Sequence, residues 1–310
     1  MTLPAEPATP MSSARTLGAA WALSAQALKA ANLDYGHGCA SAEDEAAWLV
    51  LHVAGLPATE ASWFAEHAEQ ALSPEQAQRV DALTVQRVTT RQPMAYVLGE
   101  AWLVGLRFTV DSRVIVPRSF IAELLDDGAL DPWLIEPPRR VLDMCTGSGC
   151  LAILAALTWE EAEVDAADLS PDALAVAEIN RQHYALQTRL HLLASDLWTA
   201  FAPSQVYDLV LCNPPYVPTA SMQTLPEEYR HEPSLALAGG ADGMDLVRRF
   251  LQKAPAHLSD HGVVVLEVGN ERAAFEAAFP SLPAIWLETE LHAEGVCVLL
   301  AHDLREAFAA

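Results

Sequence analysis

The tetrapeptide Asn213-Pro214-Pro215-Tyr216 directly follows an apolar run that is typical of a buried strand. Consecutive prolines cannot donate backbone hydrogen bonds and they restrict the backbone, so they present carbonyl oxygens rigidly. The side-chain amide of Asn213 adds a second carbonyl acceptor, and Tyr216 offers an aromatic face or edge to a flat group. The four residues therefore predict two oxygen acceptors for the two hydrogens of a planar NH₂ group.

The nitrogen of such a group is a weak nucleophile because its lone pair is delocalised. Two oxygens that accept its two hydrogens would fix the position of the nitrogen. They would also offset the positive charge that forms on the nitrogen during attack. The electrophile must then be strongly activated, and a sulfonium methyl meets this need. The sequence therefore predicts S-adenosylmethionine as cofactor, no metal, and the residues Asn213, Pro214, Pro215 and Tyr216 as the catalytic group.

A second motif, VLDMCTGSGC at residues 141–150, would place Asp143 on a strand before a glycine turn that opens a helix. Glycines let the backbone approach a ligand, and a helix N-terminus offers free N–H groups. Tight strand-to-helix packing would give the same turn. Only two glycines of the dinucleotide fingerprint are present, which disfavours a nicotinamide oxidoreductase.

Two further acids follow predicted strands. Asp168 is placed to accept hydrogen bonds from the ribose hydroxyls of S-adenosylmethionine, the methyl donor. Asp196 is placed to accept hydrogen bonds from the exocyclic amine of its adenine. Asp143 and the glycine turn suit the amino acid end of the donor. The residues predicted to bind the donor are Asp143, Cys145, Thr146, Gly147, Gly149, Asp168, Leu169, Asp196, Leu197 and Asn213.

The pattern along the chain indicates how these motifs are positioned. Residues 1–14 read as a flexible tail, and residues 15–92 as a helical domain for substrate recognition, with a helix that begins at Ser73. Residues 93–118 form a linker in which alternating residues 101–118 predict a β-hairpin with its turn at Asp111-Ser112.

Residues 119–310 alternate between strand and helix patterns, which predicts a parallel sheet in an α/β domain. Two final strands are expected to form a hairpin at the edge of this sheet. The predicted strands are 139–144, 164–168, 189–195, 207–212, 262–269, 284–289 and 295–301.

Composition limits the class of protein. The chain has 310 residues with 41 acidic and 18 basic side chains, a net charge of −23, and only two lysines. Nucleic-acid or membrane binding is therefore not expected, because both need clustered cations. Five cysteines without a C-x-x-C pair disfavour a disulfide framework and a structural zinc site. No apolar run reaches the ~20 residues of a membrane span, so a cytoplasmic location is expected.

These motifs resemble those of class I S-adenosylmethionine-dependent methyltransferases. They are most similar to the glutamine methyltransferases of the HemK/PrmB group, which modify the side-chain amide of a glutamine in proteins of the translation apparatus. The resemblance also covers Pro93 to Gly99 and Glu267-Val268-Gly269-Asn270. It implies a seven-stranded Rossmann-like sheet behind an N-terminal helical domain, with N(5)-methylglutamine and S-adenosylhomocysteine as products. It also implies that either Leu197 or Trp198 packs on the adenine.

One branch of this group acts on peptide-chain release factors and the other on the third large-subunit ribosomal protein. Val116-Pro117-Arg118-Ser119, the cysteines of the glycine motif and the segment 225–233 are similar to the ribosomal branch. The resemblance therefore favours the ribosomal protein as substrate, with a release factor as the alternative.

The segment 225–233 lies in a connection of about thirty residues, and connections longer than ~15 residues in a compact domain are usually functional. Its polar residues are expected to border the substrate groove, or to pin the loop through salt bridges. The residues predicted to bind the substrate are Arg118, Asn213, Tyr216, Tyr229, Arg230 and Glu232.

Two other functions compete with this interpretation. A nucleic-acid adenine N(6)-methyltransferase could use the same acceptor motif, but it would need basic grooves to hold phosphates. A catalytically silent nucleoside-binding module would be expected to have a broken acceptor motif, and this motif is intact. The acidic surface would instead help to capture a basic ribosomal protein.

Overall fold

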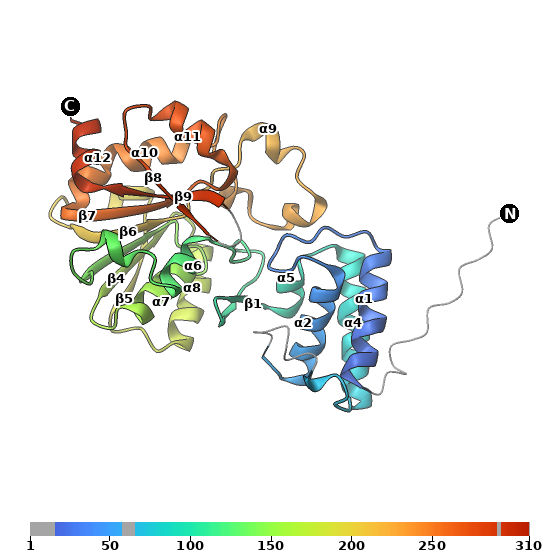
Figure 1. Ribbon diagram of the computed structural model, residues 1–310. Helices are drawn as coiled ribbons and strands as arrows, with labels where there is room; N and C mark the ends of the chain where they lie inside the picture. The colour runs from blue at the N-terminus through green and yellow to red at the C-terminus, as the bar shows by residue number, and fades with distance from the viewer. Residues whose placement is uncertain (1–15, 58–65, 290–292, 310) are drawn as a thin grey trace.

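The computed structural model describes residues 16–57, 66–289 and 293–309. A bundle of N-terminal helices lies beside an α/β unit, with a two-stranded hairpin between them (Figure 1). The predicted tail, residues 1–14, lies outside the described residues. No helix in the described part of the chain is long and apolar enough to cross a membrane.

Three of the described N-terminal helices begin at side chains that accept backbone N–H groups. These caps are Thr16, Ser41 and Ser73, and Ser73 and Gln76 form a reciprocal capping box that confirms the predicted helix start. The helices are α1 (Leu17–Ala30), α2 (Ala42–Ala54), α4 (Pro74–Thr90) and α5 (Met94–Leu98). Apolar residues at helical spacing meet in their shared core, among them Leu17, Leu28, Leu49, Val80 and Leu83.

The hairpin consists of β1 (Glu100–Leu103) and β2 (Leu106–Thr109), which pair antiparallel. The predicted hairpin turn at Asp111-Ser112 was wrong. The strands are joined by Val104 and Gly105, with φ values of 42° and 76°, because a two-residue hairpin turn of this kind needs positive φ at both positions. Residues 111–114 do form a turn, but it redirects the linker instead of joining two strands.

A buried amide, that of Asn180 on α8 (Pro171–His183), attaches the hairpin to the α/β unit. Asn180 accepts a hydrogen bond from the Thr109 N–H at 2.7 Å, and its own Nδ2 donates to the carbonyls of Thr109 and Ser148. Ser148 belongs to the glycine motif. The linker is therefore fixed against the segment in which the sequence predicts a donor site.

The α/β unit contains a seven-stranded sheet of order β5-β4-β3-β6-β7-β9-β8. The first five of its strands along the chain are parallel, and β9 lies antiparallel between β7 and β8, so the predicted edge hairpin is confirmed. The strands are β3 (Arg140–Met144), β4 (Glu163–Asp168), β5 (Leu190–Ala194), β6 (Tyr207–Cys212), β7 (Leu258–Glu267), β8 (Ile285–Glu288) and β9 (Ala293–Leu300).

Helices cover both faces of this sheet (Figure 1). Alternate residues of each central strand enter different cores: Leu209 packs with α6, α7 and α8, whereas Val210 packs with α10, α11 and α12. The helices are α6 (Ile121–Asp126), α7 (Cys150–Thr158), α8 (Pro171–His183), α9 (Thr219–Met222), α10 (Asp245–Lys253), α11 (Arg272–Ala278) and α12 (Ala301–Ala307). Strand order reverses at β3, which opens a crevice at the carboxyl ends of β3, β4 and β6.

Candidate active site

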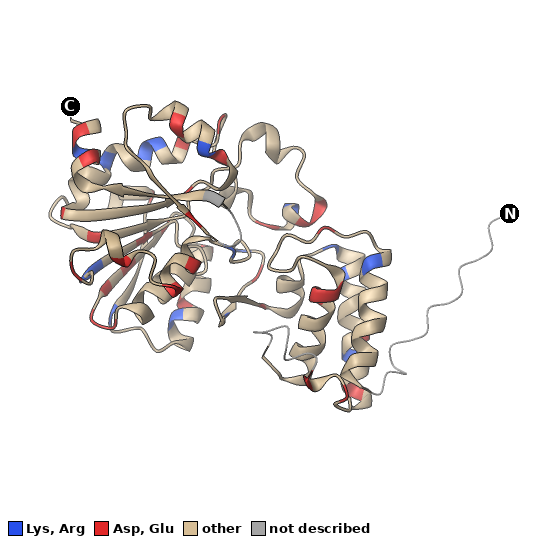
Figure 2. Cartoon of the chain, viewed as in Figure 1, with Lys and Arg blue, Asp and Glu red and all other residues tan. Residues whose placement is uncertain are grey.

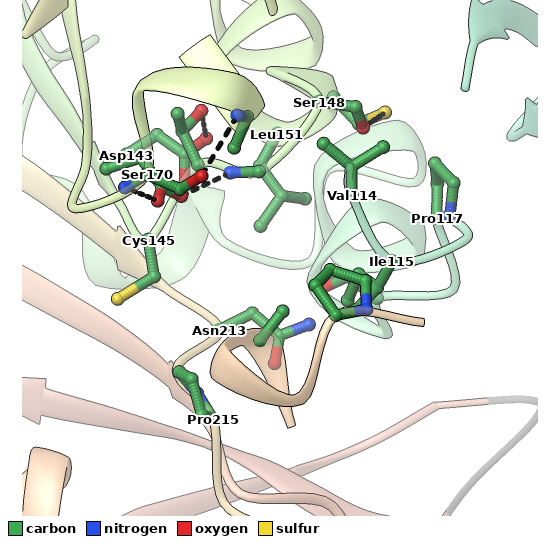
Figure 3. A pocket seen from close by; sticks show the side chains of 18 of the residues that line it. Val114, Ile115, Pro117, Asp143, Cys145, Ser148, Leu151, Ser170, Asn213 and Pro215 are labelled. Carbon is green, nitrogen blue, oxygen red and sulfur yellow. Dashed lines mark hydrogen bonds between the residues drawn. The ribbon is translucent and has the colours of Figure 1, made fainter. Parts of the chain in front are cut away.

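Three adjoining pockets lie at this crevice. The central pocket brings together the glycine motif, Asp168, Asn213 and the linker residues 113–119. The side pocket shares Cys145, Asp168 and Leu169 with it, and the acceptor pocket shares Arg118 and Asn213 with it. Figure 3 shows Asp143 and Asn213 on different walls of the central pocket, with the linker on a further side. Both predicted motifs therefore face one cavity system.

Asp143 lies at the bottom of the central pocket and is buried. Its Oδ2 accepts hydrogen bonds from the Thr146 hydroxyl at 2.5 Å and from the Ala152 N–H at 3.1 Å. Its Oδ1 has no hydrogen-bond partner among the described residues. Burial raises the pKa of Asp143 to about 7, against the lowering effect of these bonds. An unsatisfied buried acceptor of this kind suits a cationic ligand group.

The two glycines of the motif have different roles. Gly147 has a φ of +56°, and a Cβ at this position would meet nothing within 4 Å, because it would point into open space. Gly149 has a φ of +82°, and its Cβ would lie 3.2 Å from the Cβ of Ala177 on α8. Gly149 therefore serves strand-to-helix packing, whereas Gly147 leaves room at the pocket.

Asp168 ends β4 and organises the same turn. Its Oδ2 accepts the Gly147 N–H at 2.9 Å, and its Oδ1 accepts the Ser170 N–H at 2.8 Å. Burial raises the pKa of Asp168 despite these bonds. Each carboxylate oxygen keeps a second lone pair, so Asp168 can still accept a hydrogen bond from a ligand in the central pocket.

The side pocket is lined by Asp196, Leu197 and Leu169. Trp198 points elsewhere: its ring stacks on Phe250 and His257, and its Nε1–H donates to the Phe250 carbonyl at 2.9 Å. Of the two residues predicted as neighbours of the adenine, Leu197 is therefore the one that reaches a pocket.

Two lining residues of the side pocket escaped the sequence analysis. Arg249 on α10 binds Oδ2 of Asp196 at 2.7 Å, and Leu235, in the connection after β6, is 55% exposed. No local pattern in the sequence marks either residue. An exposed large apolar side chain at a pocket is the signal that identifies Leu235, and only the structure provides it.

The acceptor pocket is lined by Asn213, Pro214 and Tyr216, together with Phe120 and Glu267. The Asn213 side chain makes no hydrogen bond to another described residue, so its amide is free to bind a ligand. Burial raises the pKa of Tyr216 well above its usual value. Tyr216 therefore remains a neutral phenol.

The connection after β6 is pinned by buried charges. Glu232 accepts two hydrogen bonds from the Arg118 guanidinium, at 2.6 and 2.7 Å, and one from the Val116 N–H at 2.8 Å. Burial alone would raise the pKa of Glu232, but the adjacent His37 and Arg118 lower it to about 2. Glu232 thus holds the linker, the connection and the N-terminal bundle together.

The other residues predicted in this connection are placed differently. Tyr229 lines the acceptor pocket and lies against His37, with ring centroids 4.3 Å apart. Arg230 is exposed and lines none of the three pockets. Glu228, which the sequence analysis missed, is buried and binds Arg91 at 2.6 Å. Tyr229 therefore borders the acceptor pocket and Glu232 pins the loop, and substrate binding by this segment stays a prediction.

The sheet order and the crevice at the ends of β3, β4 and β6 define a class I Rossmann-like methyltransferase fold with an N-terminal helical part. Residues 122–226 match the family described as methyltransferase small domain, and residues 20–99 match the PrmC N-terminal domain.

Curated relatives identify the family more closely. The chain is 55% identical over 279 residues to ribosomal protein uL3 glutamine methyltransferase of Bordetella pertussis, covering 89% of this chain and 92% of the relative. Identity is 51% to the protein of that name in Burkholderia pseudomallei (88% and 91% covered) and 44% to that of Neisseria meningitidis serogroup B (88% of each). The chain belongs to the ribosomal protein uL3 glutamine methyltransferase family, which confirms the resemblance to the ribosomal branch.

Proposed function

We propose that this chain transfers a methyl group from S-adenosylmethionine to the side-chain amide nitrogen of a glutamine in ribosomal protein uL3, giving N(5)-methylglutamine. The observation that carries the proposal is the position of Asn213, which lines both the central and the acceptor pocket and whose side-chain amide makes no hydrogen bond to another described residue. A substrate amide bound there would lie next to a ligand in the central pocket.

The residues of the central and side pockets fit this methyl donor. The unsatisfied Oδ1 of Asp143 would hold the donor's ammonium group, and Asp168 would accept hydrogen bonds from its ribose. Leu169 and Leu197 would pack against the adenine beside Asp196. The bound donor supplies a methyl group on a sulfonium, which is electrophilic enough for an amide nitrogen.

The acceptor motif would then orient the substrate. The Oδ1 of Asn213 and the carbonyl of Pro214 accept one N–H each, which turns the nitrogen toward the central pocket. These oxygens also offset the positive charge that develops on the nitrogen as the new bond forms. The new N–C bond forms as the S–C bond of the donor breaks, which releases S-adenosylhomocysteine, and the methylated nitrogen then loses one proton to solvent water. Because no strong base is needed before the attack, Asn213 acts by position and by its dipole.

The relatives support uL3 as the protein substrate, because those compared carry that substrate in their names. Acidic residues occur on both the helical bundle and the α/β unit (Figure 2), and the net charge of −23 would favour a basic partner. No observation favours the release-factor alternative.

The test is to incubate the purified chain and S-adenosylmethionine with uL3, a release factor or duplex DNA in separate reactions. Mass spectrometry should find one methyl group on a glutamine of uL3 only. Methylation of the release factor without uL3, or of DNA, would contradict the proposal.

A further inference from the structure

The motif Glu267-Val268-Gly269-Asn270 has no role in the mechanism described above. Glu267 is the last residue of β7, is 1% exposed and lines the acceptor pocket. A buried carboxylate is costly unless its hydrogen bonds are satisfied. Its position beside the acceptor motif therefore calls for an explanation.

The two oxygens of Glu267 bind two different segments. Oε2 accepts the Ser119 hydroxyl at 2.5 Å and the Phe120 N–H at 3.0 Å, at the start of α6, which continues the linker. Oε1 accepts the Tyr216 hydroxyl at 3.3 Å. One side chain thus joins the acceptor motif to the linker.

Glycines hold Tyr216 closely on its other sides. A Cβ at Gly269 would lie 2.8 Å from the ring of Tyr216, and a Cβ at Gly239 would lie 2.6 Å from its Cα. Gly243 would similarly place a Cβ 2.3 Å from the Tyr216 carbonyl oxygen. Gly239 and Gly243 thus allow close packing against the Tyr216 backbone, and Gly269 does so against its ring, beside the hydroxyl that Glu267 accepts.

We propose that Glu267 is a positioning residue: through the hydroxyl of Tyr216 it fixes the Asn213 and Pro214 acceptor oxygens relative to the linker. The inference rests on the proposed function, since it assigns the acceptor oxygens to the substrate amide. Glu267 itself touches no substrate atom in this account.

The protonation state of Glu267 matters because its partners are donors. An ionised carboxylate can accept all three hydrogen bonds, whereas a protonated carboxyl must turn one O–H toward a donor. Burial raises the pKa of Glu267 to about 7, so the ionised form dominates above pH 7. The titratable groups that face Glu267 are Tyr216 and the Cys212 thiol at the end of β6. Arg118 on the linker and Glu271 beside α11 face Tyr216 in turn.

The first experiment compares Glu267→Ala and Glu267→Gln with the unmodified enzyme at saturating donor. Glu267→Ala should lower kcat by about 10²-fold, the effect of misplacing reacting groups by ~1 Å, with an unchanged donor Kd. Glu267→Gln keeps the shape of the side chain, so it should recover part of this loss.

The pH profile separates positioning from a general loss of structure. The readout is kcat at saturating donor, because the donor's ammonium group keeps Asp143, whose pKa is also raised to about 7, ionised in the complex. This kcat should fall about tenfold per pH unit below pH 7 in the unmodified enzyme, and Glu267→Gln should remove the dependence, because an amide does not titrate. The control is Glu163→Gln, which alters an exposed glutamate at the end of β4 away from Asp168. This variant should behave as the unmodified enzyme. An unchanged kcat in Glu267→Ala, or an unchanged pH profile in Glu267→Gln, would overturn the inference.

A double variant tests the route through Tyr216. If Glu267 acts through that hydroxyl, the losses of kcat caused by Glu267→Ala and by Tyr216→Phe should not add in the double variant. Fully additive losses would contradict this route.

Hydrogen exchange at the Val217 N–H, just after the acceptor motif, should also become faster in Glu267→Ala, and this readout needs no substrate. An unchanged rate of hydrogen exchange at Val217 would overturn the inference, whatever the substrate of the enzyme is. If the unmodified enzyme is inactive on uL3, only the proposed function is contradicted.

Discussion

The central pocket and the acceptor pocket meet at Asn213 but are built differently. The central pocket comes from consecutive strand and helix units, and backbone N–H groups of residues 147, 152 and 170 hold its acids. The acceptor pocket depends on side chains from distant segments, such as Arg118 with Glu232 and Tyr216 with Glu267. In the proposed function, donor binding is thus a local property of the sheet, whereas substrate positioning depends on how the bundle, linker and connection meet.

The largest effect is expected at the residue that the two pockets share. Asn213→Ala should lower kcat by about 10²–10³-fold, the usual cost of removing a group that stabilises transition-state charge, and leave the donor Kd unchanged. Gln187→Ala, which alters an exposed amide in the turn before β5, is the control. Normal turnover in Asn213→Ala, measured with saturating uL3, would show that its oxygen is not needed.

Asp168→Ala should affect the central pocket alone. Losing the acceptor for the ribose and for the Gly147 N–H should weaken donor binding by about 10–100-fold, since hydrogen bonds to a charged group contribute ~1.5–3 kcal/mol. The kcat at saturating donor should change much less. Calorimetry checks this, with Asp172→Ala, an exposed carboxylate on α8 that lines none of the three pockets, as control. An unchanged donor Kd would contradict the assignment.

Glu232→Gln should act on the acceptor side and leave donor binding intact. It removes the charge that faces Arg118, so we expect a loss of about 2–3 kcal/mol in the free energy of unfolding, below the range for a fully buried pair, and a higher KM for uL3. Glu227→Gln, in an exposed pair with Arg91, should cost less than ~1 kcal/mol.

The loss of stability caused by Glu232→Gln should depend on pH. The pKa of Glu232 lies at about 2 in the folded chain, below its unfolded value, so its ionised form stabilises the fold above about pH 4.5. The contribution is lost as the pH falls toward 2. The free energies of unfolding of the unmodified protein and of Glu232→Gln, measured from denaturation curves, should therefore converge in acid. A difference that stays constant with pH would contradict the role of this charge.

The smallest effect concerns encounter with the substrate. If the acidic surface attracts a basic protein, raising the ionic strength from ~0.05 to ~0.3 M should raise the KM for uL3 several-fold, because exposed charges are screened. The donor Kd should not follow this change. An affinity for uL3 that stays flat across this range would exclude electrostatic capture.

This difference between the pockets also explains what the sequence could predict. Asp143, Gly147 and Asp168, which line one pocket, could be predicted as neighbours because strand ends and glycine turns have local signatures. The hairpin turn was misplaced because Asp111-Ser112 is a stronger turn signal than Val104-Gly105. Contacts such as Arg118 with Glu232 join residues far apart in the chain, and no spacing in the sequence encodes them.

The most direct test is a crystal structure with S-adenosylhomocysteine and a uL3 peptide that contains the target glutamine. The glutamine Nε2 should lie ~3 Å from both the Asn213 Oδ1 and the Pro214 carbonyl oxygen and face the donor's sulfur across the central pocket. A glutamine bound elsewhere, or a donor outside the pocket lined by Asp143 and Asp168, would contradict the account.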